Sequence, residues 1–297
     1  MSNLLHQAVG EKHPARVSPA KAGRPQKPHS MPLMLRVMRA GFRIGGTLTP
    51  KLAGRVAYRL WFTPTRYKTP ASEKEALQSA VMDRQLIQGQ TIATYQWGQS
   101  GPKVLLVHGW SGRGTQLGSF VKPLMSAGFR VLSFDGPAHG VSTGKQTNLF
   151  EFAHVIQTLN DIYGPFDSVI THSFGGPCLT LAIKKGFNTS RVVNISPPSN
   201  MEALVKKFCS TLSIPAKAEQ DLKRRIEKKF GSNIWQEISM LNHVRDINMP
   251  ALVIHDEDDV DIDWQDGETV AQSWNNARFI KTSGLGHRRI LRDRPTI

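Results

Sequence analysis

A serine, a cluster of aspartates and a histidine follow one another in this sequence in an order that could support nucleophilic catalysis. Ser173 stands in the hexamer THSFGG at residues 171–176, after a short apolar run and before a run compatible with a helix. A strand, a sharp turn and a helix would expose the serine hydroxyl at the top of a sheet, with a helix N-terminus behind it to stabilise an anion. The hexamer therefore predicts the nucleophile of a hydrolase, although an ordinary strand-to-helix loop is the alternative.

Three further motifs surround this hexamer. Two apolar runs end in glycine-containing loops, KVLLVHGWSG at residues 103–112 and VLSFDGPAHGVS at residues 131–142. Downstream, residues 251–255 lead into an acidic loop, and His287 follows near the end. Each apolar run is typical of a buried strand, so the motifs are expected at strand ends. The order serine, acid, histidine is the chain order of the serine hydrolases built on an α/β-hydrolase sheet.

From about Gln90 onward, the chain resembles the α/β-hydrolases of the esterase and lipase type. The resemblance rests on the HG turn, the D-G-x-x-x-G-x-S loop, the serine elbow, and the acid and histidine loops taken together. It implies a triad of Ser173, Asp259 and His287. It also implies an acyl-enzyme reaction on a carboxylic ester or thioester, with no cofactor.

The chemistry explains these residue types. A serine hydroxyl is a weak nucleophile near neutral pH, so a histidine must take its proton and a carboxylate must orient the imidazolium. The tetrahedral intermediate carries an oxyanion, and the resemblance assigns its donors to the backbone N–H groups of Trp110 and Phe174. The remaining histidines near these motifs are expected to pack or to shape loops: His108, His139, His172 and His255.

The acid is the member of the triad that the sequence defines least, because six carboxylates crowd residues 256–263. The family usually places its acid three residues after a turn residue that directly follows the strand. That turn residue is Asp256 here, where glycine is common, so the acid maps to Asp259. Asp258 is the alternative.

The sequence has no pattern typical of a metal, nucleotide or disulfide site. Asp259, Asp261 and Asp263 alternate as in a calcium loop, but Trp264 stands where an EF-hand loop needs glycine. The two cysteines form no CxxC pair, and no P-loop is present. We therefore predict neither a metal nor a cofactor.

Thr171 departs from the family pattern, which prefers glycine at this position. Threonine fits a strand end but adds bulk in a crowded elbow. The departure keeps a second class of function open, a catalytically weak, membrane-associated protein that retains the fold. A peptidase of the same fold is a further alternative. A serine rather than an aspartate at position 173 argues against a dehalogenase or an epoxide hydrolase.

Length and composition fit one α/β domain with an extension. The chain has 297 residues, of which 39% are hydrophobic, and its strand and helix patterns alternate. We therefore predict a mostly parallel central sheet with helices on both faces, within residues 69–297. Residues 196–250 read as a small helical lid whose Met and Trp side chains favour a small-molecule ester with an apolar acyl or alkyl group.

The net charge of +15 is concentrated at the front of the chain, because residues 1–68 hold 13 lysines and arginines and a single acid. Residues 1–30 are rich in proline, lysine, arginine and serine, which predicts a disordered basic tail. Residues 31–68 are expected to form a basic amphipathic helical extension. Through residues 31–62 this extension would either contact an anionic membrane or pack on the hydrolase domain.

No module for nucleic-acid binding accompanies this charge, and no apolar run is long enough to span a bilayer. We therefore expect no nucleic-acid partner and a cytoplasmic location, with peripheral membrane contact as the alternative. Only ten residues follow His287, whereas the family normally ends with a helix that covers one sheet face. We expect either a truncated chain or a face covered by a partner or by the apolar side chains of the extension, namely Leu35, Met38, Phe42, Val56 and Leu60.

Overall fold

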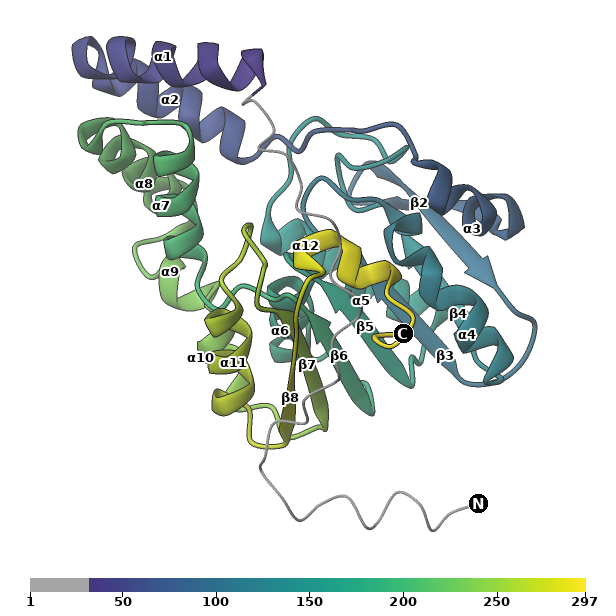
Figure 1. Cartoon of the computed structure of the whole chain (residues 1–297). Helices are drawn as coiled ribbons and strands as arrows, with labels where there is room; N and C mark the ends of the chain where they lie inside the picture. The colour runs from purple at the N-terminus through teal and green to yellow at the C-terminus, as the bar shows by residue number, and fades with distance from the viewer. Residues whose placement is uncertain (1–31) are drawn as a thin grey trace.

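A computed structural model describes residues 32–297, so the predicted tail at residues 1–30 lies outside the described part of the chain. The centre of the fold is an eight-stranded sheet with the order β1-β2-β4-β3-β5-β6-β7-β8 (Figure 1). The first two pairs in this order are antiparallel, and all the others are parallel. The strands are β1 (Val81–Ile87), β2 (Gln90–Trp97), β3 (Lys103–Val107), β4 (Arg130–Phe134), β5 (Ser168–His172), β6 (Arg191–Ile195), β7 (Ala251–Asp256) and β8 (Ala277–Thr282).

Local sequence explains where this sheet turns and where its strands end together. Gln88 and Gly89 both adopt positive φ, 47° and 75°, which closes the β1–β2 hairpin with the twist that a two-residue turn requires. In the parallel part, Val107 pairs with Thr171, and His172 pairs with Ile195. The carboxyl ends of β3, β5, β6 and β7 therefore lie along one edge, where ligands bind in sheets of this kind.

Helices cover both faces of the sheet, which confirms the predicted fold class. One face carries η1 (Ala71–Glu73), α3 (Lys74–Ser79), η2 (Gly114–Phe120), α4 (Val121–Ser126), α12 (Gly286–Arg289) and η3 (Ile290–Arg292). The other face carries α5 (Leu149–Tyr163), α6 (Gly175–Lys184), α10 (Met240–Val244) and α11 (Trp264–Ser273). Helix α5 begins at Asn148, whose side chain accepts the N–H groups of Phe150 and Glu151 while its amide bonds the Glu151 carboxylate.

A helical layer lies above the carboxyl edge of the sheet (Figure 1). It contains α7 (Met201–Thr211), α8 (Ala216–Phe230) and α9 (Ile234–Glu237), and α1 (Leu33–Leu48) and α2 (Pro50–Trp61) pack against α8. Small residues permit this contact, since a Cβ added to Gly54 would lie 2.6 Å from Cβ of Asp221, and one on Gly46 would lie 2.7 Å from Cδ of Pro215. We call α7, α8 and α9 the lid, and α1 with α2 the N-terminal helix pair.

The expectation that the N-terminal helix pair covers a bare sheet face is wrong. The pair packs on the lid instead, through buried Phe42 and partly buried Leu35, Met38 and Leu60, while Val56 is exposed. The sheet face in question is covered by η2, α4, α3 and the short C-terminal segment, where Ile290 and Leu291 are buried. Within residues 32–297, no helix combines the length and the hydropathy needed to cross a membrane.

Candidate active site

Ser173 occupies a sharp turn between β5 and α6, as the hexamer predicts. Its φ of 52° is unusual for a residue other than glycine and marks a strained turn. Small neighbours make the turn possible, because a Cβ at Gly175 would lie 2.7 Å from the backbone oxygen of Val107, and one at Gly109 would lie 3.0 Å from Cβ of Ser173 itself. The turn presents Ser173 to a cavity above the carboxyl edge of the sheet.

Thr171, where the family prefers glycine, fits this elbow without displacing Ser173. Its side chain is fully buried, and its hydroxyl donates to Oδ1 of Asn194 on the neighbouring strand β6, at 2.6 Å. The register of β5 and β6 places these two residues directly opposite each other. The extra bulk is therefore accommodated by a hydrogen bond across the sheet.

The acidic loop brings Asp259, rather than Asp258, to the predicted histidine. Oδ2 of Asp259 lies 2.6 Å from Nδ1 of His287, while Oδ2 of Asp258 accepts the backbone N–H of Gly284. Burial raises the pKa of Asp259, but hydrogen bonds from His255 and His287 outweigh this effect and hold the pKa well below its usual range. The carboxylate is thus charged at neutral pH and can stabilise an imidazolium at His287.

His255 is a second histidine on the same carboxylate, which the sequence suggested only as a structural residue. Its Nε2 lies 3.1 Å from Oδ2 of Asp259 and 3.2 Å from the backbone oxygen of Ile262. Since both atoms are acceptors, Nε2 carries the proton and donates to them. On its other side, a Cβ at Gly267 would lie 2.4 Å from Nδ1, so a glycine is needed for the ring to fit. His255 therefore fixes the carboxylate that His287 contacts.

Asp256 organises the loop that carries His287. Its Oδ1 accepts the backbone N–H groups of Leu285 and Gly286, at 3.1 and 2.7 Å, and its Oδ2 accepts the Thr282 hydroxyl at 2.7 Å. The side chain is fully buried. Sequence reasoning treated Asp256 only as a turn position, although an aspartate directly after a buried strand was a signal that its carboxylate binds a neighbouring loop.

The loop after β3 lies beside Ser173 and supplies the predicted oxyanion donor Trp110. Gln116 accepts the backbone N–H of Gly109, and Nε2 of His139 accepts that of Ser111, so the loop is held on both sides of Trp110. Within residues 32–297, neither the Trp110 nor the Phe174 backbone N–H donates to a protein acceptor. Both residues line the cavity that Ser173 also lines. Their side chains pack edge to face, with ring centroids 5.2 Å apart.

Asp135 and two histidines tie the loops after β3 and β4 together. Asp135, buried, accepts the backbone N–H groups of Gly114 and Val141, and the hydroxyl of Tyr95. Nε2 of His108 accepts the backbone N–H of Gly136 at 2.9 Å. Burial lowers the pKa of His108 to about 4 and that of His139 to about 3. Both rings are therefore neutral at pH 7 and act as hydrogen-bonding supports, as the sequence suggested.

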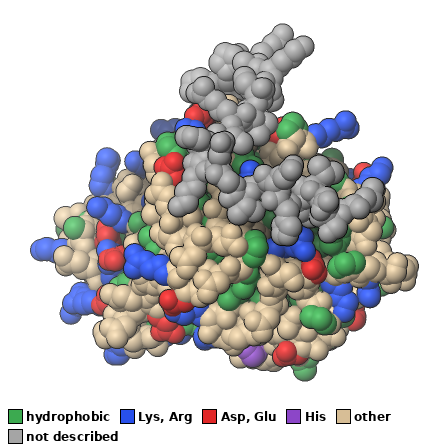
Figure 2. Space-filling model, turned by 90° about the horizontal axis from the view of Figure 1, so that it is seen from below, with side chains coloured by type: hydrophobic (Ala, Val, Ile, Leu, Met, Phe, Trp, Pro, Cys, Tyr) green, Lys and Arg blue, Asp and Glu red, His purple; other side chains and the backbone are tan. Residues whose placement is uncertain are grey.

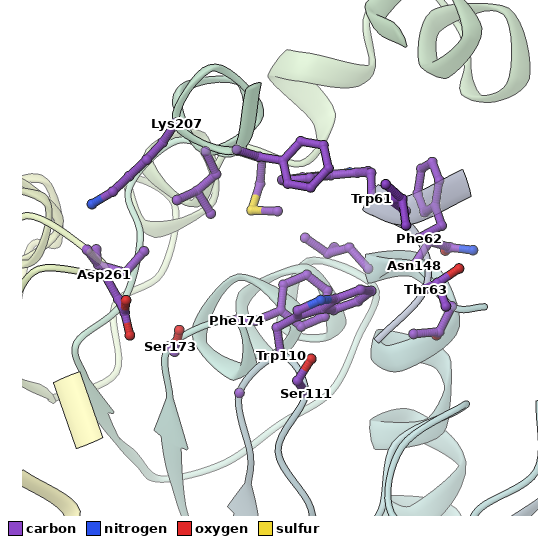
Figure 3. Close-up of a pocket in the computed structure, with 18 of the residues that line it drawn as sticks. Trp61, Phe62, Thr63, Trp110, Ser111, Asn148, Ser173, Phe174, Lys207 and Asp261 are labelled. Atoms are coloured by element: carbon purple, nitrogen blue, oxygen red, sulfur yellow. The ribbon is translucent and has the colours of Figure 1, made fainter. Parts of the chain in front are cut away.

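A cavity of about 730 Å³ lies between these loops and the helical layer, and Figure 3 shows the two sides of it. Ser173, Phe174, Trp110 and Ser111 lie along its floor. Its roof is apolar and largely aromatic, formed by side chains in or directly after the helices of the lid and the N-terminal helix pair, including Met38, Trp61, Phe62, Met201, Leu204, Phe208, Phe230, Trp235 and Ile238.

The polar end of the cavity also contains charged side chains. Lys207, Asp261 and Arg288 line it together with Ser173 and His287. The described residues contain no group of three or more His, Cys, Asp or Glu side chains arranged to hold a metal ion. The arrangement can therefore hold a molecule with an apolar arm under the lid and a polar group beside Ser173.

Comparison with known proteins agrees with this architecture. The profile of the alpha/beta hydrolase family matches residues 104–296. This chain belongs to the alpha/beta hydrolase family. A comparison with curated proteins finds no match.

Solved structures of several hydrolases and related enzymes are similar to this α/β-hydrolase. Alpha/beta hydrolase domain-containing protein 10 from mouse has a TM-score of 0.59 at 14% identity, over 73% of this chain and 94% of that one. An esterase from Exiguobacterium antarcticum has a TM-score of 0.56 at 15% identity, over 71% and 94%. A bromoperoxidase from Bacillus anthracis has a TM-score of 0.54 at 16% identity, over 71% and 94%. These proteins are named for different activities. Because the identities are this low, the likeness shows the fold alone.

Proposed function

We propose that this protein is a serine hydrolase that cleaves a carboxylic ester or thioester through an acyl-enzyme intermediate. The observation that carries the proposal is the 2.6 Å contact between Asp259 and His287, in a cavity that both His287 and the elbow residue Ser173 line. This contact and the shared cavity support the triad that the family resemblance implies. The esterase from Exiguobacterium antarcticum and a thioesterase domain from the curacin biosynthetic pathway, both structural neighbours, are compatible with this proposal.

In the proposed reaction, Ser173 Oγ attacks the substrate carbonyl carbon as His287 Nε2 takes the hydroxyl proton. Nε2 is the acceptor because Nδ1–H donates to Asp259, whose negative charge stabilises the imidazolium that forms. The carbonyl oxygen becomes an oxyanion, and the backbone N–H groups of Trp110 and Phe174 donate to it. His287 then returns the proton to the leaving group. In the second half of the reaction, His287 takes a proton from water as the water attacks the acyl-enzyme, and it returns the proton to Ser173 Oγ when the acid leaves.

The cavity supports an apolar acyl or alkyl group in the substrate. Its roof offers aromatic and aliphatic side chains such as Phe208 and Trp235, while the charged side chains of Lys207 and Asp261 lie toward the side of Ser173 (Figure 3). Burial of methylene groups under such a roof contributes about 0.8 kcal/mol each. An ester with a chain of several carbons would therefore bind better than an acetate.

Hydrolysis of p-nitrophenyl esters of increasing chain length tests this proposal. Ser173→Ala should abolish hydrolysis and leave the thermal midpoint nearly unchanged. Ser111→Ala is the matched control, because Ser111 also has positive φ and also lines the cavity floor. Ser111→Ala should retain activity within about tenfold of the wild type, since its hydroxyl only accepts the backbone N–H of Thr65. Full activity of Ser173→Ala, or loss only in Ser111→Ala, would overturn the assignment.

A further inference from the structure

Helix α1 presents an apolar stripe to solvent on the side that does not pack on the lid. Leu33, Val37, Ile44 and Leu48 repeat at spacings of four and seven residues, which place them on one face of a helix. Their exposed fractions are 73%, 64%, 64% and 77%. On the other side of the same helix, Phe42 and Gly46 are buried. Leu52 and Val56 of α2 are exposed as well.

Basic side chains flank this stripe, and no acidic side chain accompanies them. Helices α1 and α2 carry six lysines and arginines between residues 33 and 61, and the sequence has no aspartate or glutamate from residue 12 to residue 72. None of the six forms an ion pair within residues 32–297. These side chains are Arg36, Arg39, Arg43, Lys51, Arg55 and Arg59.

A hollow beside the turn between α1 and α2 extends the basic surface onto the lid. It measures about 610 Å³ and is lined by residues 49–52 and by side chains of α8, with Lys51, Lys217 and Arg224 contributing three positive charges. One of these, Arg224, also lies 3.4 Å from Asp221. A hollow of this size and charge, next to exposed Leu52, suits an anionic headgroup.

We infer that the N-terminal helix pair docks on the surface of an anionic phospholipid membrane. The apolar stripe would enter the boundary between headgroups and acyl chains, while the flanking cations would contact lipid phosphates. A second copy of the chain is a poorer occupant, because it would place like charges against each other. Residues 1–31 are poorer too, since they add five basic side chains and one acidic one.

The opposite side of the molecule differs from this surface. Figure 2 shows the molecule from below, where lysines and arginines are mixed with acidic and apolar side chains over the visible described atoms. In contrast, the stripe and its cations in α1 and α2 gather apolar and basic residues with no acid. The helix pair therefore differs in composition from the face that Figure 2 shows.

Docking there would set the roof of the cavity beside the bilayer. Met38 of α1 and Leu60, Trp61 and Phe62 at the end of α2 line the cavity that Ser173 also lines. An ester leaving the membrane would therefore enter next to the elements that hold the protein on the lipid. This consequence rests on the proposed function, whereas the docking itself does not.

Vesicle co-sedimentation of the full chain tests the docking. Vesicles of equal parts phosphatidylcholine and phosphatidylglycerol should bind the protein, vesicles of phosphatidylcholine alone should bind it weakly, and added salt should reduce binding. Ile44→Glu combined with Leu48→Glu should lower the partition coefficient about tenfold or more, because two exposed apolar groups that would enter the membrane become charged. Leu86→Glu in strand β1 is the matched control, since Leu86 is 77% exposed, as is Leu48. It should bind like the wild type.

Companion measurements keep this inference separate from the proposed function. Ser173→Ala should sediment with anionic vesicles as the wild type does. The double variant Ile44→Glu with Leu48→Glu, called the stripe variant, should keep its hydrolysis of a short soluble ester and its thermal midpoint. The inference is overturned if the wild type does not sediment, if Leu86→Glu loses binding equally, or if the stripe variant changes only the oligomeric mass in light scattering. The last result would assign the stripe to a second copy of the chain.

Discussion

The floor and the roof of the cavity are built by different physical means. The floor consists of loops at strand ends, and buried carboxylates hold each loop to the next, as Asp135 and Asp256 do through backbone N–H groups. The roof consists of helices that meet through apolar and aromatic contacts, such as the edge-to-face pair of Trp61 and Phe208. Directional bonds fix atoms to within tenths of an ångström, whereas apolar packing tolerates changes in shape. The floor can therefore set a reaction, and the roof can set which substrates reach it.

The largest effect is expected from the carboxylate in the floor that contacts His287. Asp259→Asn should lower kcat roughly a thousandfold or more, because the amide neither stabilises the imidazolium nor enforces the right tautomer. Asp258→Asn is the matched control and should stay within about tenfold of the wild type, since the Asp258 carboxylate accepts the backbone N–H of Gly284 and does not contact His287 among the described residues. Steady-state kinetics on a p-nitrophenyl ester measure both. The reverse ranking would place Asp258 in the triad.

A smaller loss is expected when a floor residue only positions the histidine loop. Asp256→Ala should lower kcat by about tenfold to a hundredfold and the free energy of unfolding by about 1–3 kcal/mol, because the partly buried N–H groups of Leu285 and Gly286 lose their acceptor. Steady-state kinetics measure the change in kcat, and urea unfolding measures the change in the free energy of unfolding. Glu257→Gln, at an exposed neighbour 3.6 Å from Lys281, should change neither quantity much. Equal losses in both variants would show that Asp256 has no special role.

The roof should control chain-length preference and leave the chemistry intact. Phe208→Ala should reduce kcat/KM for a long-chain ester about tenfold, through lost apolar contact, and leave kcat/KM for the acetate nearly unchanged. Leu124→Ala, on the far face of the sheet, removes a partly buried side chain outside the cavity. It should leave the ratio of kcat/KM for the long-chain ester to kcat/KM for the acetate unchanged. If Phe208→Ala instead lowers kcat/KM equally for both esters, the roof also supports the geometry of the floor, and the two regions do not have separate roles.

The last effect, which changes stability and not the reaction, is a dependence of the free energy of unfolding on acid pH that comes from the floor. His108 and His139 have folded-state pKa values lowered from 6.5 to about 4 and about 3, so the unfolded chain binds more protons between those values and pH 6.5. Stability should therefore fall as pH decreases below 6.5, with about 1.4 kcal/mol per pH unit from each histidine. Burial raises the pKa of Asp135, which opposes part of this loss. Urea unfolding from pH 7 to pH 5 should show a smaller slope in His139→Gln, and an unchanged slope would contradict the assignment.

Sequence patterns were sufficient for the sheet and for the elbow of Ser173, because apolar runs of five or six residues followed by glycine-rich loops determine where parallel strands end. The pairing of Asp259 with His287 came from the resemblance to the α/β-hydrolases, and the structure places the two side chains in contact. The family pattern left Thr171 unexplained, because its acceptor Asn194 lies on another strand and is 23 residues away.

Other parts of the site depended on tertiary contacts that no local pattern contains. Packing against the sheet was one of the alternatives for the N-terminal helix pair, but its docking on α8 requires Gly54 to face Asp221 across more than 160 residues of chain. The roles of His255 and Asp256 depended on which loop each side chain meets after folding. Both residues stand at the end of one buried strand. Asp256 anchors the loop that carries His287 only because folding brings that loop next to its carboxylate.

A fluorophosphonate probe tests the central claim most directly, since it forms a covalent bond only with an activated serine. The full chain is incubated with the probe, and the modified peptide is located by mass spectrometry. We expect a single modification at Ser173, faster in the wild type than in Asp259→Asn and absent from Ser173→Ala, with Ser111 unmodified in all three. A folded wild-type protein that remains unlabelled, or that is labelled at Ser111, would contradict the account.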